Sequence, residues 1–223
     1  MFNKTRVLVI NYNNILRQSE IPLFRGAVIS SVGEENINVL FHNHVGETVR
    51  YKYPKIQYKR IKNSAAIVCL NEGADTIGQF LSTTSAPLKI GERKELMTVK
   101  SINASQCLIQ VWNSNFSYHL RKWLPFNQDN YKIYNNLSGI VEKTKLLEKI
   151  LIGNILSFAK GVDVTLKKEV VCTIESCEEP VLLKYKGVKM MSFDLVFRTN
   201  VSLPDFVGIG KGVSLGFGTV TKI

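Results

Sequence analysis

The sequence lacks the features that mark a secreted or membrane-embedded protein. No uninterrupted apolar stretch approaches the ~18 residues of a membrane span, and the early apolar run Val7-Leu8-Val9-Ile10 gives way to polar Asn11. We therefore expect neither a signal peptide nor a membrane partner. The four cysteines form no C-x-x-C pair, and a chain of 223 residues needs no disulfide staples. These absences favour a reduced, cytoplasmic protein.

Acidic residues are also scarce. The chain has 18 acidic residues against 29 lysines and arginines, which gives a formal net charge of +11. An imbalance of this size favours a polyanionic partner, with nucleic acid ahead of an acidic membrane surface. Hydrophobic residues make up 45% of the chain, which argues against disorder and supports a packed core.

Metal ligands are few, and the histidines are unevenly placed. Cys172 and Cys177 are separated by four residues and have no histidine nearby, so the sequence does not indicate a zinc site, and we expect no metal or cofactor. Two of the three histidines are His42 and His44. Such a pair can act in acid/base catalysis near neutral pH. The alternatives are two structural histidines, or a metal pair for which only Glu47 is close enough to add a ligand.

The spacing of apolar residues predicts strands mixed with helices. Helices are expected over residues 20–32, 72–82 and 140–161, and the last has the clearest helical period. The segment 130–139 is polar and indicates turns. Strands are expected over residues 5–13, 36–44, 64–70, 118–126, 164–176 and 180–200, with a strand, a turn and another strand over 95–112. The pattern predicts an α+β fold of two tandem ferredoxin-like (RRM-like) domains, residues 1–113 and 114–223.

A basic, aromatic run extends from residue 50 to residue 62, and no acidic residue lies between Glu47 and Glu72. Cations contact phosphates and aromatic rings stack on unpaired bases, so this run favours RNA or DNA binding. The alternative is a solvated edge strand, where lysines discourage aggregation. The run contains Arg50, Tyr51, Lys52, Tyr53, Lys55, Tyr58, Lys59, Arg60 and Lys62.

A glycine-rich segment, "FVGIGKGVSLGFGTV", lies at residues 206–220. Its glycines do not have the spacing of a dinucleotide fingerprint or of a phosphate-binding Walker loop. A tight hairpin would explain two of the five glycines, so we expect a loop that presents backbone N–H groups to an anion. Lys211 would add a charge, and the glycines are Gly208, Gly210, Gly212, Gly216 and Gly218.

These features together resemble a CRISPR-associated repeat-RNA endoribonuclease of the RAMP superfamily, whose members cut precursor transcripts into guide RNAs for antiviral defence. The superfamily pattern is two G-hydrophobic-G triplets separated by five residues, here Gly208–Gly210 and Gly216–Gly218. "YKYPKIQYK" and "EKILIGNILSFAKG" also look like segments of a bacterial branch. The resemblance implies ferredoxin-like halves, a catalytic histidine in the N-terminal half, and repeat RNA as partner. A homodimer and an effector complex are further partners that it allows.

The resemblance also implies a mechanism. RNA carries its own nucleophile, the 2′-OH, so a ribonuclease without metal needs a base, an acid and a cation near the phosphate. His42 and His44 are the acid/base candidates, with their two roles open. Lys52 or Lys55 would stabilise charge, and Tyr51 or Tyr53 would orient the nucleotide, to give a 2′,3′-cyclic phosphate and a 5′-hydroxyl. The alternatives are a subunit that binds guide RNA without cutting it, and a scaffold that binds nucleic acid without specificity.

Overall fold

The computed structural model describes residues 4–32, 44–45, 48–49, 53–83 and 86–223. The chain forms two compact units. The first contains Met1–Cys107 together with Ser214–Gly216, and the second contains Leu108–Val213 together with Phe217–Ile223. The domain boundary expected between residues 113 and 114 lies inside one long strand, β9 (Val111–Trp123).

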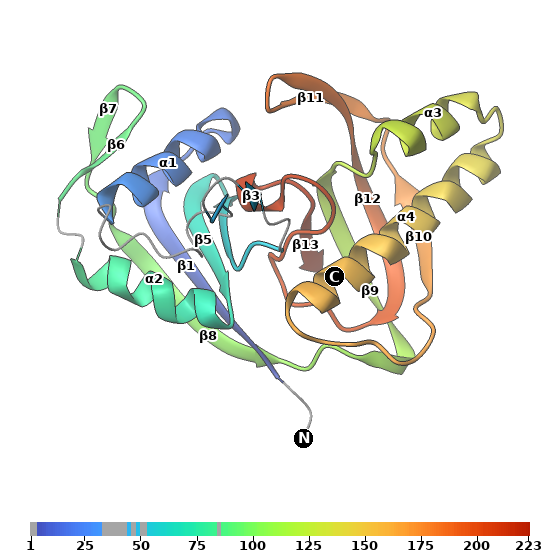
Figure 1. The fold of residues 1–223 in the computed structure, drawn as a ribbon, viewed down its shortest axis with the longest axis horizontal. Coiled ribbons are helices and arrows are strands. Elements are labelled where there is room, and N and C mark those ends of the chain that lie inside the picture. The colour runs from blue at the N-terminus through green and yellow to red at the C-terminus, as the bar shows by residue number, and fades with distance from the viewer. Residues whose placement is uncertain (1–3, 33–43, 46–47, 50–52, 84–85) are drawn as a thin grey trace. The chain divides into compact units, whose positions relative to one another are not determined.

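The first unit has the β-α-β-β-α-β order of a ferredoxin-like domain (Figure 1). Its sheet has the strand order β4-β5-β1-β8, and every pairing in it is antiparallel. The elements are β1 (Thr5–Ile15), η1 (Gln18–Glu20), α1 (Ile21–Ser31), β2 (His44–Val45), β3 (Thr48–Val49), β4 (Ile56–Ile61), β5 (Ser64–Leu70), α2 (Glu72–Thr83), β6 (Leu88–Ile90), β7 (Arg93–Glu95) and β8 (Val99–Cys107).

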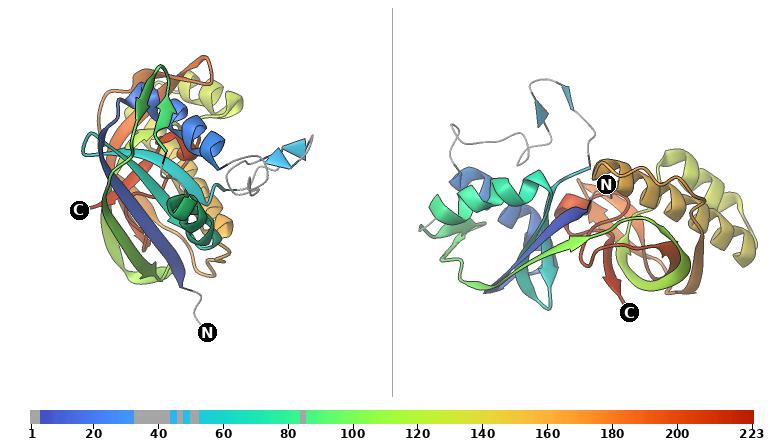
Figure 2. Two further views of the ribbon diagram at one scale, coloured as in Figure 1. Left: turned by 90° about the vertical axis from the view of Figure 1, so that its left-hand side faces the viewer. Right: turned by 90° about the horizontal axis from the view of Figure 1, so that it is seen from below.

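An aromatic cluster forms the centre of the first unit's core. Helices α1 and α2 pack on the sheet (Figure 2), and Phe24 of α1 meets Tyr12 and Tyr58 edge-on, with ring centroids 6.1 and 5.7 Å apart. These geometries are ones that aromatic pairs prefer. Leu215, from the glycine-rich segment, packs against the same core. The first unit therefore includes three residues that lie far away in sequence.

The second unit repeats this order with one replacement. Its sheet has the strand order β10-β12-β9-β13, with β11 paired to β12. Between β12 and β13, where a ferredoxin-like domain has its second helix, the chain has the glycine-rich segment and a short 3-10 turn. The elements are β9, α3 (Gln128–Asn136), α4 (Ile140–Gly161), β10 (Cys172–Cys177), β11 (Val181–Tyr185), β12 (Val188–Val201) and β13 (Thr219–Lys222). The 3-10 turn η3 (Val213–Leu215) begins in this unit, and its last two residues belong to the first unit.

The fold class expected from the sequence, α+β with tandem ferredoxin-like domains, is confirmed. The helix expected over residues 140–161 is α4, and the strand over 64–70 is β5. The expectation of turns at 130–139 is wrong, because most of it lies in α3. The strand expected over 164–176 begins only at Cys172.

The strand expected over residues 36–44 falls outside the described residues, except for His44 at its end. In the part of the chain that the structure describes, we find no helix that combines the length and hydropathy needed to cross a membrane.

Two glycines of α2 predict opposite responses to alanine. A Cβ on Gly73 would lie 2.6 Å from the carbonyl oxygen of Lys55, whereas a Cβ on Gly78 would meet no atom within 4 Å. Gly78→Ala should raise the free energy of unfolding by about 0.5–1 kcal/mol, because alanine loses less backbone entropy. Gly73→Ala should lower it. Denaturant titration measures both, and a stabilised Gly73→Ala would contradict this packing.

Candidate nucleic-acid interface

The glycine-rich segment folds back on itself, and its glycines are required by that path. Gly218 has a φ of +60°, and a Cβ there would overlap the carbonyl oxygen of Ile209. The amide of Ile209 in turn donates to the carbonyl of Gly218 at 2.8 Å. Only glycine allows two backbone stretches to approach so closely at this φ. The conformation of the segment therefore depends on this position.

Gly210 is fixed by a neighbouring tryptophan. Its φ is +90°, and a Cβ there would lie 2.8 Å from the Trp123 indole. The Trp123 indole Nε1 donates to Asn154 Oδ1 of α4 at 2.9 Å. Asn154 lies among the apolar residues of α4, and a polar residue in such a position is the sequence signal for a buried hydrogen bond. Positive φ also holds for Gly212 and Gly216.

Several amides of the segment already have acceptors inside the protein. The N–H groups of Ile209, Lys211, Phe217 and Gly218 donate to backbone carbonyls over distances of 2.8–3.4 Å. An amide that donates internally has no hydrogen left for an anion. These four amides therefore cannot be among the backbone N–H groups that we expected the loop to present to an anion. Contact between the glycines and RNA stays a prediction.

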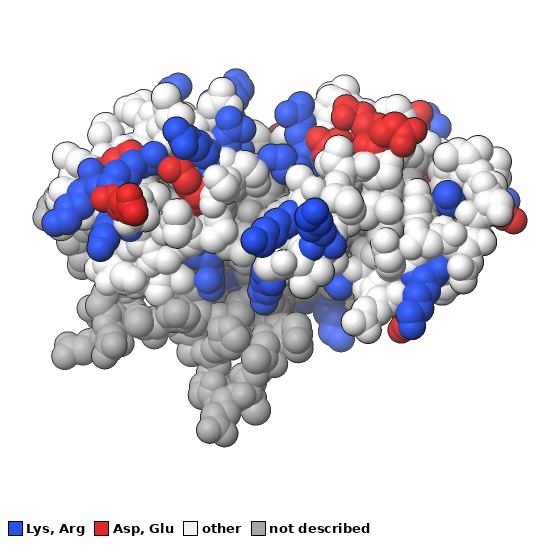
Figure 3. Space-filling view, turned by 90° about the horizontal axis from the view of Figure 1, so that it is seen from above, with Lys and Arg blue, Asp and Glu red and all other residues white. Residues whose placement is uncertain are grey.

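Lys211 offers the segment a charge at the surface. Its side chain is exposed, and its neighbour Gly210 is half-buried. On the face drawn in Figure 3, basic side chains are spread over the surface, and the acidic ones gather in separate groups. Exposed lysines of this kind can contact phosphates without an ion-pair partner to displace.

Three basic residues of the run, Lys55, Lys59 and Arg60, are buried or engaged in contacts within the protein. Lys55 is 8% exposed, and its Nζ lies 3.4 Å from Glu72 Oε1. Arg60 is exposed, but its guanidinium donates to the carbonyl of Leu16 at 2.7 Å and to Asn63 Oδ1. Strand β4 lies at the edge of its sheet, but its residues from Ile56 to Lys59 are buried, so it is not the solvated edge strand of the alternative interpretation.

Lys59 is buried rather than exposed, which corrects the expectation of a surface residue. Its exposed fraction is 1%, on a strand whose residues from Ile56 to Lys59 are all buried. Burial disfavours the charged amine and lowers the pKa of Lys59 to about 7. Sequence could not show this, because the charge of a side chain does not reveal which face of a strand is covered.

The remaining candidates lie largely outside the described residues. His42, Arg50, Tyr51 and Lys52 are not among them. The backbone of His44 belongs to β2, where it pairs with Val49 of β3. Their catalytic roles stay predictions. Among residues 4–32, 44–45, 48–49, 53–83 and 86–223, no group of three or more His, Cys, Asp or Glu side chains could hold a metal ion.

Tyr53 and the third histidine are described. The Tyr53 hydroxyl accepts a hydrogen bond from Gln57 Nε2 at 2.8 Å. His119 is half-buried in the middle of β9, opposite Val196 of β12 and Thr221 of β13. Its backbone therefore belongs to the central part of the second unit's sheet.

Comparison with known families covers both units. A family model for the Cas6b N-terminal domain matches residues 3–107, and one for the Cas6b C-terminal domain matches residues 110–223. The chain belongs to the Cas6b family. This membership confirms the CRISPR-associated RAMP family that the histidine pair, the basic run and the glycine segment indicated. It also accounts for the order of the two units.

Solved structures agree with this membership. A crystal structure of a Cas6b is 27% identical, with a TM-score of 0.88, and the alignment covers 99% of this chain and 100% of that one. A structure of a CRISPR RNA processing endoribonuclease Cas6b is 25% identical, with a TM-score of 0.76 and the same coverage of both chains. A Methanocaldococcus jannaschii protein described as uncharacterized is 41% identical over 101 residues, which are 45% of this chain and 67% of that protein.

Substitutions in the glycine segment should separate folding from binding. Gly210→Ala should lower the free energy of unfolding by about 2 kcal/mol or more, because the added carbon meets the Trp123 indole at a strained φ. Lys211→Ala should leave stability unchanged and weaken RNA binding. If Lys211 contacts one phosphate, the slope of log affinity against log salt should become shallower by about 0.7.

Thermal melting and binding titrations at several salt concentrations measure these effects. Lys145→Ala, which removes an exposed lysine of α4, is the matched control for lost charge. A Gly210→Ala chain that melts like the wild type would contradict the tight contact with Trp123. An unchanged salt slope in Lys211→Ala would remove that side chain from the interface.

The buried amine of Lys59 predicts a dependence of stability on pH. The free energy of unfolding rises with pH wherever the unfolded chain binds more protons than the folded one. Above pH 7 the unfolded chain keeps a proton on Lys59 that the folded chain has lost, because the folded pKa is about 7 against an ordinary 10.5. Between pH 7 and 8.5, the free energy of unfolding of the wild type should rise by about 1 kcal/mol per pH unit relative to that of Lys59→Met.

The pH interval avoids a second group that acts in the opposite direction. Burial raises the pKa of Cys69 above its ordinary 9.0, so this thiol lowers stability at higher pH. Denaturant titrations of the wild type, Lys59→Met and Lys94→Met provide the measurement, since Lys94 is exposed. Equal pH dependence in all three chains would contradict a buried, neutral amine at position 59.

Proposed function

We propose that this protein is an endoribonuclease that cuts CRISPR precursor RNA within its repeats to give guide RNA. The observation that carries the proposal is the match of both Cas6b domain models, in order, over residues 3–107 and 110–223. The structure of a CRISPR RNA processing endoribonuclease Cas6b, aligned over 99% of the chain, supports the same activity. The net charge of +11 suits a polyanionic substrate.

The cut would use the 2′-OH of the RNA as nucleophile, without a metal ion. One histidine of the pair His42 and His44 takes the 2′-OH proton, and the other protonates the leaving 5′-oxygen. Their spacing suits this work, because side chains two residues apart in an extended chain point to the same side. The products are a 2′,3′-cyclic phosphate and a 5′-hydroxyl.

The positive charge near the phosphate comes from the run that follows the histidines. Lys52 or Lys55 would stabilise the phosphorane, and Tyr51 or Tyr53 would orient the nucleotide. Of these, Lys55 is paired with Glu72 in the structure, which favours Lys52 for a role that needs a side chain to reach the RNA. The homodimer and the effector complex expected from the sequence stay predictions.

Histidine substitutions test the catalytic proposal. His42→Ala and His44→Ala should each slow single-turnover cleavage by about 10²–10⁴, because each removes one proton transfer. Neither should change RNA affinity much, since one imidazole is a small part of a charge-driven interface. His119→Ala is the matched control and should cut at the wild-type rate once its fold is verified. Wild-type rates in both variants would contradict the assignment.

The substrate and the conditions provide a second, independent test. A repeat RNA with hydrogen in place of the 2′-OH just 5′ of the cut should bind almost as well and stay intact, because the nucleophile is gone. Cleavage of normal RNA should persist in excess chelator and should fall below about pH 6, where the base histidine is protonated. Tight binding without cleavage under all conditions would favour the binding-only alternative, and cleavage that stops in chelator would contradict the metal-free mechanism.

A further inference from the structure

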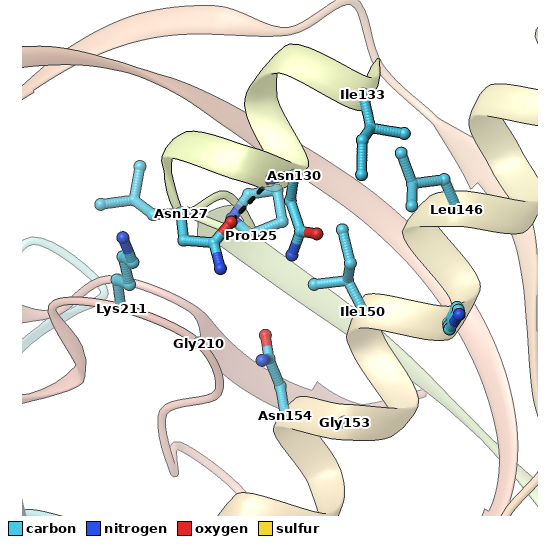
Figure 4. Close-up of a pocket in the computed structure, with 12 residues that line it drawn as sticks. Pro125, Asn127, Asn130, Ile133, Leu146, Ile150, Gly153, Asn154, Gly210 and Lys211 are labelled. Carbon is cyan, nitrogen blue, oxygen red and sulfur yellow. Dashed lines mark hydrogen bonds between the residues drawn. The ribbon is translucent and has the colours of Figure 1, made fainter. Parts of the chain in front are cut away.

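A pocket opens in the second unit between α3, α4 and the glycine-rich segment. Its volume is about 470 Å³, and Figure 4 shows the side chains around it. The walls come from the residues between β9 and α3, the first two turns of α3, the middle of α4 and the loop at Gly210 and Lys211. A volume in this range fits one small-molecule-sized group. Of the residues that line it, only Gly210 and Lys211 belong to the segment expected to bind RNA.

Three asparagine amides converge on this pocket. In Figure 4 the side chains of Asn127, Asn130 and Asn154 point toward its centre from α3 and α4. Asn127 Oδ1 accepts from the backbone N–H of Asn130 at 2.7 Å, and Asn154 Oδ1 accepts from the Trp123 indole at 2.9 Å. Both partners are donors, so in each amide the oxygen faces its partner. The Nδ2 groups of Asn127 and Asn154 are then the ends that can donate to an occupant.

The rest of the lining is largely apolar, with two exposed lysines beside it. Leu146 and the buried Ile150 form an aliphatic wall on α4. Lys149 and Lys211 are exposed and lie at the same pocket. An inorganic anion would have no use for the aliphatic wall, and a purely apolar ligand would leave the amides without acceptors. A flat ring that carries acceptor atoms on its edge and is attached to a negatively charged group can contact the aliphatic wall, the asparagine amides and the lysines at the same time.

We propose that this pocket holds one unpaired nucleotide of the RNA. The base lies against Ile150 and Leu146, its edge accepts hydrogen bonds from the asparagine amides, and the adjoining phosphates face Lys149 and Lys211. A base in a duplex cannot enter, because its edge is paired and its faces are stacked; proteins read RNA sequence mostly at unpaired positions. This inference rests on the proposed function in that it requires RNA as the ligand.

Gly153 offers a way to fill the pocket without disturbing the fold. It lies on the exposed side of α4 at the pocket, and a Cβ there would meet no atom within 4 Å. Gly153→Met therefore adds a side chain beside the space assigned to the base. Gly78→Met is the matched control, because Gly78 is also an exposed helix glycine with open space around it, but in α2.

The experiment combines these variants with altered RNAs. The affinity of the full chain is measured for a repeat RNA from its own CRISPR array, and for copies in which each unpaired nucleotide in turn is abasic. One abasic position should weaken binding to the wild type about 10-fold, in the range of a lost base contact. Gly153→Met should weaken binding to the intact RNA by a similar factor. The Gly153→Met chain should then bind the RNA that is abasic at this one position as tightly as it binds the intact RNA.

Asn130→Ala gives a second readout that does not depend on filling the pocket. It removes an amide and should weaken binding to the intact RNA about 3-fold. On the RNA that is abasic at the same position, the wild type and Asn130→Ala should bind equally well. Asn136→Ala, at an exposed position of α3, should bind like the wild type. Coupling of both pocket variants to one abasic position supports the proposal.

Two results would overturn the proposal, and they differ in what they leave standing. In the first, the wild type binds and cuts the RNA, but both pocket variants bind it as tightly as the wild type does, or each variant and each abasic change weaken binding independently. That result would show that only the nucleotide pocket is wrong. If the folded wild type binds no repeat RNA, the proposed function is wrong as well.

Discussion

The contact between Gly218 and the backbone of Ile209 sets the path of the C-terminal segment. It closes the glycine-rich loop just before β13, which then pairs with β9. Glycine at this point lets two backbone stretches approach closely, and the chain reaches β13 through a loop and a short 3-10 turn. The second unit consequently keeps its ferredoxin-like strand order with a loop where its second helix would be. The same turn places Gly210 beside Trp123 and exposes Lys211.

Burial divides the basic residues of this protein into two groups. Lys59 is covered, and Lys55 is nearly so and is paired with Glu72, whereas Lys149 and Lys211 are exposed around a pocket. A formal charge of +11 therefore does not describe a uniform surface. Electrostatic attraction to RNA depends mainly on the exposed lysines, because their charges can approach the phosphates. Burial lowers the pKa of Lys59 to about 7 and so reduces the charge that it carries at neutral pH.

Much of the architecture could be predicted from the sequence, and the misses have physical causes. Helix α4 was predicted because its apolar residues recur at helical spacing, and strand β5 because it is a short, uninterrupted apolar run. Helix α3 was missed because none of its residues is buried, and its start depends on the side chain of Asn127. The spacing of the glycine triplets identified the family, but not that Trp123 and Ile209 are what the glycines accommodate. Likewise, no pattern in the run from residue 50 to 62 distinguished the covered lysines from the exposed ones.

We propose that the RNA supplies the nucleophile for its own cleavage, and the ends of the products distinguish this from attack by water. Mass spectrometry of the two fragments after a single turnover identifies these ends directly. Attack by the 2′-OH should leave a 2′,3′-cyclic phosphate on the upstream fragment and a 5′-hydroxyl on the downstream one. A 3′-hydroxyl paired with a 5′-phosphate would contradict it, because those ends require an external nucleophile and leave the 2′-OH without a role.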